Sequence, residues 1–154
     1  MHLLICGHSV VHRLSRRSDL FGLCRFPPGR SVRFDGRPGA CVGSFITSIP
    51  VLDPMPDVIF FVLGENDIGR YHPNQILSSF ITLCGILGQA GVPCVVLGSM
   101  FPWFHPRGLS VSQYGRVAHF LNRDLPRVFL PSDFVVFLKI RGFRAVYLSS
   151  DCVH

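Results

Sequence analysis

The sequence predicts an α/β fold in which a parallel β-sheet lies between two layers of helices. Short, continuous apolar runs alternate along the chain with longer stretches in which apolar residues recur at helical spacing. Uninterrupted apolar runs are typical of parallel strands that are buried on both faces of a sheet. Strands separated by helices indicate β-α-β units, so we expect a three-layer α/β/α sandwich.

Four uninterrupted apolar runs predict the buried strands of this sheet. The clearest is "DVIFFVL", Asp57–Leu63, which is rich in β-branched and aromatic residues and is bounded by Pro56 and Gly64. The other three runs are His2–Cys6, Val92–Leu97 and Phe134–Leu138. Two shorter segments of mixed composition, Ser31–Asp35 and Phe143–Leu148, are weaker strand candidates.

Three stretches between these runs predict helices. Pro73–Gly91 begins with proline and ends with glycine, which are favoured at the two ends of a helix. Val10–Leu20 and Ser110–Leu125 also read as helical, the second because its apolar residues are spaced by three or four. The 154 residues contain no internal repeat or linker, so we expect residues 1–154 to form one domain.

The charge of the chain is basic and comes almost entirely from arginine. The net charge is +6, and Lys139 is the only lysine. The arginines are scattered, apart from two short clusters within residues 13–17 and 25–37. A solvated surface accounts for this pattern, and contact with nucleic acid or another polyanion is the alternative. No basic helix, zinc finger or aromatic RNA-binding motif supports the alternative.

The cysteine and histidine spacings do not predict a metal site or disulfides. None of the six cysteines belongs to a CxxC pair, and several lie in apolar runs, where a thiol acts as a small hydrophobic group. We therefore expect reduced cysteines and an intracellular, cytoplasmic protein. The apolar N-terminus is short for a signal peptide, and no run approaches the ~20 apolar residues of a membrane span.

Polar residues and glycines follow the predicted strands, at the edge of a parallel sheet where ligands gather. "GHS" with Ser9 follows the first strand, "GRPGA" with Gly39 follows the second, and "GEND" with Asn66 follows the third. The chain closes on "DCVH", which contains Asp151 and His154. We expect these four segments to lie at one edge of the sheet.

Each of these residues also has a structural interpretation. Ser9 can cap the following helix, and Gly39, Asn66 and Asp67 are residue types common in turns. Asp151 and His154 can belong to a frayed terminus. Four such matches in chain order, each at a strand end, nevertheless favour a chemical role over four unrelated turns.

In these residues the sequence resembles the SGNH (GDSL-like) hydrolases over nearly its whole length. The resemblance implies a flavodoxin-like parallel sheet, no cofactor and no metal. It implies that Ser9 is the nucleophile, that His154 is its base and that Asp151 orients the base. It also implies that the Ser9 N–H, the Gly39 N–H and the Asn66 side chain form an oxyanion hole. Asp67 is expected to brace its loop.

The sequence departs from the family pattern at two places. His8 stands where the family often has aspartate, and it either lines the site or serves the local structure. Many family members continue past the histidine into a closing helix, which this chain lacks. The "GHS" variant, the arginine bias and the missing secretion signal are similar to SGNH domains carried in eukaryotic retroelement proteins. Phe101–His105 follows the fourth strand and either walls an acyl pocket or packs on the core.

Two functions follow from this reading. The first is hydrolysis of small or medium carboxylic esters, such as acetyl or other acyl esters, through an acyl-enzyme. Acyl transfer to a sugar or alcohol would use the same residues. The alternative is a non-catalytic module of the same fold that binds nucleic acid, through its scattered arginines, or a protein partner. The sequence does not indicate the oligomeric state.

Overall fold

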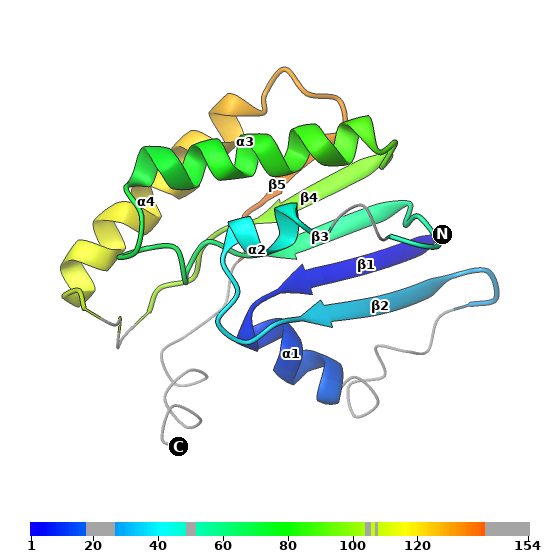
Figure 1. The fold of residues 1–154 in the computed structure, drawn as a ribbon, viewed down its shortest axis with the longest axis horizontal. Helices are drawn as coiled ribbons and strands as arrows, with labels where there is room; N and C mark the ends of the chain where they lie inside the picture. Colours follow the sequence, from blue (N-terminus) through cyan, green and yellow to red (C-terminus); the bar gives the residue numbers. More distant parts are fainter. Residues whose placement is uncertain (18–26, 49–51, 104–105, 107, 141–154) are drawn as a thin grey trace.

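The computed structural model describes residues 1–17, 27–48, 52–103, 106 and 108–140. In this part of the chain, five parallel strands form a sheet in the order β2-β1-β3-β4-β5 (Figure 1). The strands are β1 (His2–Gly7), β2 (Ser31–Gly36), β3 (Val58–Val62), β4 (Cys94–Gly98) and β5 (Val135–Leu138). The α/β prediction is confirmed, and the weak candidate at residues 31–35 is strand β2. The other weak candidate, Phe143–Leu148, lies outside the described residues.

Four helices connect or follow these strands. They are α1 (Ser9–Arg16), α2 (Val42–Ile46), α3 (Pro73–Gln89) and α4 (Val111–Val128). Helix α2 was not predicted, because five residues are too few to show a helical period. Helix α4 continues through Pro126, past its expected end near Leu125. A proline this close to the helix end removes only one of the last N–H bonds.

The helices cover both faces of the sheet. Alternate residues of a strand point to opposite faces. In β1, Leu4 and Cys6 belong to the larger apolar cluster, together with residues of α2, α3 and α4. Ile5, between them, packs instead against a smaller cluster that contains Val11 of α1. Helix α1 therefore covers one face and the other three helices cover the opposite face, which gives the three predicted layers.

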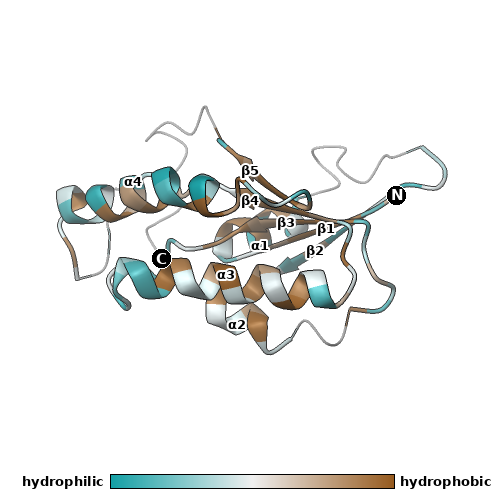
Figure 2. Cartoon of the chain, turned by 90° about the horizontal axis from the view of Figure 1, so that it is seen from above, coloured by the Kyte–Doolittle hydropathy of each residue, from teal (hydrophilic) through white to brown (hydrophobic). Residues whose placement is uncertain are grey.

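The larger cluster is the main core. Helix α3 buries one stripe of its surface, formed by Ile76, Phe80, Leu83, Cys84 and Leu87. Helix α4 buries Tyr114, Ala118, Leu121 and Leu125, which are also spaced by three or four residues. Figure 2 shows that the central strands, on which these helices pack, are coloured hydrophobic. Burying one large apolar side chain stabilises a fold by roughly 1.5–3 kcal/mol, so this stripe pattern holds α3 and α4 on the sheet.

The described cysteines and helices can be compared with the sequence predictions of reduced thiols and of no membrane span. Within the described ranges, Cys6, Cys41, Cys84 and Cys94 are free thiols. Burial raises the pKa of the Cys6 and Cys84 thiols to about 12, so both stay protonated. None of the described helices combines the length and hydropathy needed to cross a bilayer.

Candidate active site

Three neighbouring strands end at the same level of the sheet. Gly7, the last residue of β1, pairs with Gly36 of β2 on one side and with Val62 of β3 on the other. The strand order reverses here, because the chain passes from β1 to β2 in one direction and then to β3 in the other. Open parallel sheets bind ligands at such a reversal, beside the carboxyl ends of the strands. The loops that follow β1, β2 and β3 are therefore the candidate site.

Ser9 is the first residue of α1 and directly follows this strand end. His8 is the N-cap of the helix, and its side chain accepts a bond from the Val10 N–H. Ser9 is half-buried. The first N–H groups of a helix lack helical acceptors and carry a partial positive charge. The turn from β1 into α1 thus places the Ser9 hydroxyl beside donors that suit a developing negative charge.

Hydrogen bonds tie the three loops to one another. The Arg37 N–H donates to the Gly7 carbonyl at 2.8 Å, which joins the second loop to the first. The Asn66 side-chain amide donates to the Ala40 carbonyl at 3.0 Å, which joins the third loop to the second. His8 Nε2 lies 3.0 Å from Glu65 Oε2, which joins the first loop to the third. The structure therefore brings the segments of Ser9, Gly39 and Asn66 together.

Gly39 is exposed in the loop after β2, and its backbone φ is +74°. A Cβ at this position would meet nothing within 4 Å. The left-handed conformation, rather than crowding by neighbouring atoms, therefore favours glycine here.

Asn66 is held by its own hydrogen bond. A side-chain amide has two N–H groups. One of them is used in the bond to the Ala40 carbonyl, and this bond fixes the orientation of the amide. Asn66 is half-buried, so a ligand can approach the group. Asn66 is thus oriented and accessible, as an oxyanion donor must be.

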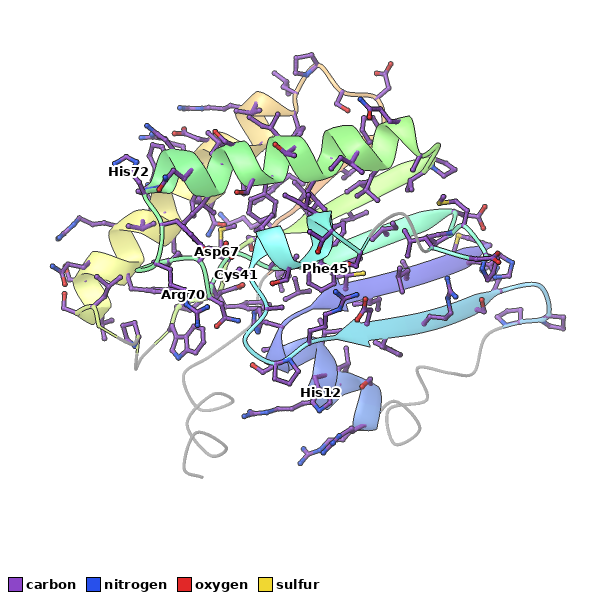
Figure 3. All side chains as sticks on the ribbon, in the orientation of Figure 1. His12, Cys41, Phe45, Asp67, Arg70 and His72 are labelled. Carbon is purple, nitrogen blue, oxygen red and sulfur yellow. The ribbon has the colours of Figure 1, made fainter. Side chains whose placement is uncertain are left out.

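Asp67 braces the neighbouring loop, as the sequence analysis expected. Its carboxylate accepts bonds from the Val42 N–H at 3.3 and 3.1 Å, and Val42 begins helix α2. Figure 3 shows Asp67 beside Cys41 and Arg70, and the Arg70 guanidinium lies 3.4 Å from Cys41 Sγ. Burial raises the pKa of Asp67 to about 6, although the Val42 N–H opposes this shift. Burial likewise raises the pKa of the Cys41 thiol.

His8 and Glu65 form a buried pair behind Ser9. The two side chains are 3% and 2% exposed. His8 Nδ1 lies 3.4 Å from Ser9 Oγ, while Nε2 faces Glu65. Glu65 Oε1 accepts a bond from the Phe101 N–H at 3.0 Å. The sequence analysis left open whether His8 lines the site or serves the local structure, and it assigned Glu65 no role.

The aromatic loop after β4 packs partly on the core and partly on His8. Phe101 is buried, and its carbonyl accepts a bond from the Tyr114 hydroxyl at 3.1 Å. The Trp103 ring stacks on the His8 ring at a centroid distance of 6.4 Å and meets Tyr114 edge-on at 6.2 Å. Phe101 therefore packs on the core, as one of the two alternatives predicted. Trp103 instead contacts the ring of His8, the residue next to the candidate nucleophile Ser9. Phe104 and His105 lie outside the described residues.

No protein-family model and no curated protein matches this sequence. Solved structures match its fold. A Bacteroides fragilis protein described as an acylhydrolase superposes with a TM-score of 0.72 at 18% identity, over 95% of this chain and 74% of that one. AlinE4, an SGNH-hydrolase family esterase, superposes with a TM-score of 0.59 at 18% identity, over 89% of this chain and 74% of its own. The fold is that of the SGNH hydrolases.

Two further solved structures match this fold at similarly low sequence identity. Axe2, an acetylxylan esterase from Geobacillus stearothermophilus, matches with a TM-score of 0.59 at 17% identity, over 89% of this chain and 74% of that one. A Streptococcus pneumonia protein described as a platelet activating factor matches with a TM-score of 0.70 at 18% identity, over 89% of this chain. The present chain spans 64% of the length of that protein. The superpositions show the SGNH-hydrolase fold. Because the sequence identities are low, they show the fold alone, and the chemistry must be argued from the site.

Within the SGNH-hydrolase fold, the structure places three of the five residues predicted for the site. Ser9, Gly39 and Asn66 lie on loops that are bonded to one another. Asp151 and His154, the predicted orienting acid and base, lie outside the described residues. Their roles therefore stay predictions.

A signal for the His8–Glu65 pair was present in the sequence. In the sheet, β1 and β3 are neighbours, so the loops that follow them lie side by side. "GHS" and "GEND" put a histidine and a glutamate at these two places. Reading the motifs as pairs across the sheet, rather than one by one, would have identified the contact.

The raised pKa of Asp67 leads to a prediction about stability. Between pH 3.8 and about 6, the folded chain holds a proton that the unfolded chain releases. The free energy of unfolding therefore falls as pH rises through this window, by up to about 3 kcal/mol. Asp67→Asn removes the titration and keeps an oxygen that can accept the Val42 N–H. Urea denaturation should show that the free energy of unfolding of the variant, relative to that of the wild type, is greater at pH 7 than at pH 4. A difference that does not change with pH would contradict the assignment.

Proposed function

We propose that this chain hydrolyses carboxylic esters through an acyl-enzyme formed on Ser9. The observation that most supports this proposal is that the three loops after β1, β2 and β3 are hydrogen-bonded to one another. These loops carry Ser9, Gly39 and Asn66, and Ser9 is the first residue of α1. Neighbours of the same fold include proteins described as an acylhydrolase and an acetylxylan esterase. We therefore favour small esters, such as acetyl esters, as the substrate class.

The proposed mechanism begins with attack of Ser9 Oγ on the ester carbonyl carbon. A serine hydroxyl needs a base to take its proton as the new bond forms. His154 takes this role in the proposal, and Asp151 orients its ring and stabilises the imidazolium. The tetrahedral intermediate then releases the alcohol, which receives the proton from His154. Water attacks the acyl-enzyme by the same route, which frees the acid and restores Ser9.

The proposed oxyanion hole combines three donors from the three loops. The N–H of Ser9 lies in the first turn of α1, where helical acceptors are missing. The N–H of Gly39 comes from the exposed loop after β2, and the amide of Asn66 comes from the loop after β3. Donors held in place before the reaction stabilise the oxyanion without reorganisation at the moment of attack.

A fluorophosphonate probe tests the proposed nucleophile directly. The probe should form one covalent adduct, and peptide mapping by mass spectrometry should place it on Ser9. Prior boiling of the protein should abolish the adduct, because labelling depends on the folded site. An adduct on another serine, or none at all, would refute the assignment.

Removal of the Asn66 amide tests the oxyanion hole. Asn66→Ala should lower kcat for p-nitrophenyl acetate by about 10²–10³-fold, because one donor to the transition state is lost. KM should change much less. Asn74→Ala, at the exposed start of α3, is the matched control and should leave kcat unchanged. Thermal melting should accompany both variants, since Asn66 also bonds the Ala40 carbonyl. A kcat within about threefold of wild type in a folded variant would exclude Asn66 from the hole.

A further inference from the structure

The buried His8–Glu65 pair has no role in the mechanism proposed above. An ionisable pair this deeply buried is costly unless both partners are well bonded. Both are: His8 Nε2 lies 3.0 Å from Glu65 Oε2, and Glu65 Oε1 accepts the Phe101 N–H at 3.0 Å. Each carboxylate oxygen thus has a partner, and the glutamate is fixed from two sides. The fold therefore holds both side chains of the pair in fixed positions.

The hydrogen bonds assign the tautomer of His8. Nδ1 accepts a bond from the Val10 N–H at 3.5 Å, so this nitrogen has its lone pair free of a proton. The ring proton is then on Nε2, from which it donates to Glu65. The same Nδ1 lies 3.4 Å from Ser9 Oγ, so the hydroxyl hydrogen can take its single lone pair in place of the Val10 N–H, whose 3.5 Å contact is long for a hydrogen bond. Serine, imidazole and carboxylate therefore form one continuous line of contacts.

The imidazole is also fixed by packing. Trp103 stacks on its face with an angle of 22° between the rings, and Trp103 is itself held by the edge of Tyr114. His8 is only 2% exposed, so water does not compete for its nitrogens. A base that is held in position by a carboxylate and shielded from solvent is the arrangement that activates a serine hydroxyl.

We propose that His8, oriented by Glu65, is a second proton acceptor for Ser9, in addition to His154. This inference rests on the proposed function of Ser9 as the nucleophile. As Ser9 Oγ bonds to the carbonyl carbon, its proton moves to His8 Nδ1, which gives up its long contact with the Val10 N–H. The Glu65 carboxylate stabilises the imidazolium. As the bond to the leaving oxygen breaks, the proton passes from Nδ1 to the alcohol. The 3.4 Å separation shortens when substrate binds, as is usual for catalytic contacts in unliganded sites.

The experiment measures fluorophosphonate labelling rates in the full chain. His154→Ala should lower the rate by about 10–10²-fold yet leave it clearly above the Ser9→Ala baseline, because His8 still accepts the proton. Adding His8→Asn to His154→Ala should bring the rate to that baseline. Adding His12→Asn instead is the matched control, since His12 lies one turn further along α1, and it should leave the residual rate unchanged.

Glu65→Gln separates a positioning role from a purely structural one. In the His154→Ala background, this change should lower the residual rate about tenfold, because an amide stabilises the imidazolium less than a carboxylate does. In the background that also contains His8→Asn, it should have no further effect, since Glu65 acts through His8. If His8→Asn does not fold, as judged by thermal melting, the proposal is decided by the effect of Glu65→Gln on the residual labelling rate of His154→Ala. An unchanged residual rate there would overturn the proposal.

Failure of this inference can be told apart from failure of the proposed function. If His154→Ala alone falls to the Ser9→Ala baseline while the wild type is labelled on Ser9, His8 accepts no proton and the proposed esterase site stands. Equal effects of His8→Asn and His12→Asn would also overturn the role of His8. If Ser9→Ala is labelled as fast as the wild type, both proposals are wrong.

Discussion

Ser9→Ala should reduce the hydrolysis of p-nitrophenyl acetate by about 10³-fold or more. Alanine has no atom that can attack the carbonyl carbon, so no acyl-enzyme forms. The fold should tolerate the change, because the N-cap of α1 is His8 rather than Ser9. Among the residues that the structure describes, the one polar contact of Ser9 Oγ is to His8 Nδ1, at 3.4 Å. Initial rates and a thermal melt of the same preparation are the measurements.

A second serine on the same helix provides the control for Ser9→Ala. Ser15 donates its hydroxyl to the His12 carbonyl at 2.7 Å, away from the strand ends. Ser15→Ala should therefore keep the full rate. Full activity of Ser9→Ala would show that the nucleophile is wrongly assigned. An unreactive wild type that binds single-stranded RNA in a salt-dependent way would favour the binding-module alternative.

Gly36→Ala should damage both the fold and the site. Gly36 ends β2, and a Cβ at this position would overlap backbone atoms of α1, with the Val11 carbonyl carbon only 2.7 Å away and the His12 backbone closer still. Backbone atoms cannot rotate aside, so α1 must move off the sheet. We expect a loss of about 1–3 kcal/mol or more in the free energy of unfolding. Because α1 positions Ser9, the fluorophosphonate labelling rate should fall as well.

Another glycine gives the matched control for Gly36→Ala. Gly43 lies in α2, and a Cβ there would meet nothing within 4 Å. Gly43→Ala should be neutral or stabilise the fold by about 0.5–1 kcal/mol, because alanine loses less backbone freedom than glycine in a helix. Urea denaturation compares the two variants. If Gly36→Ala is as stable and as reactive as Gly43→Ala, the close packing of α1 on β2 is wrong.

The sequence predicted the strands better than the short elements between them. Uninterrupted apolar runs such as "DVIFFVL" mark strands that are buried on both faces, so β1, β3, β4 and β5 were predicted. Helix α2 was missed because its position depends on contacts rather than on periodicity. Its first N–H group, that of Val42, is bonded to Asp67, whose loop is distant in sequence. The sequence predicted a helix end near Leu125, whereas α4 continues through Pro126 to Val128.

At the candidate site, the sequence located residues but did not reveal all their reasons. Ser9, Gly39 and Asn66 each follow a strand, and the parallel sheet brings them to one edge. The reason for glycine at residue 39 became clear only from its positive φ. The contact between His8 and Glu65 depends on β1 and β3 being neighbours, so the two motifs indicate it only once the strand order is known.

By itself, the sequence determined which segments are strands and which polar residues stand at their carboxyl ends, because hydrophobic period and turn residues are local properties of the chain. Only the tertiary structure decided how those ends meet. The level register of β1, β2 and β3 brings three loops within hydrogen-bonding distance of one another. Burial then placed His8 and Glu65 against each other and against Ser9. Such contacts join residues far apart in the chain, so they arise from packing and not from sequence pattern.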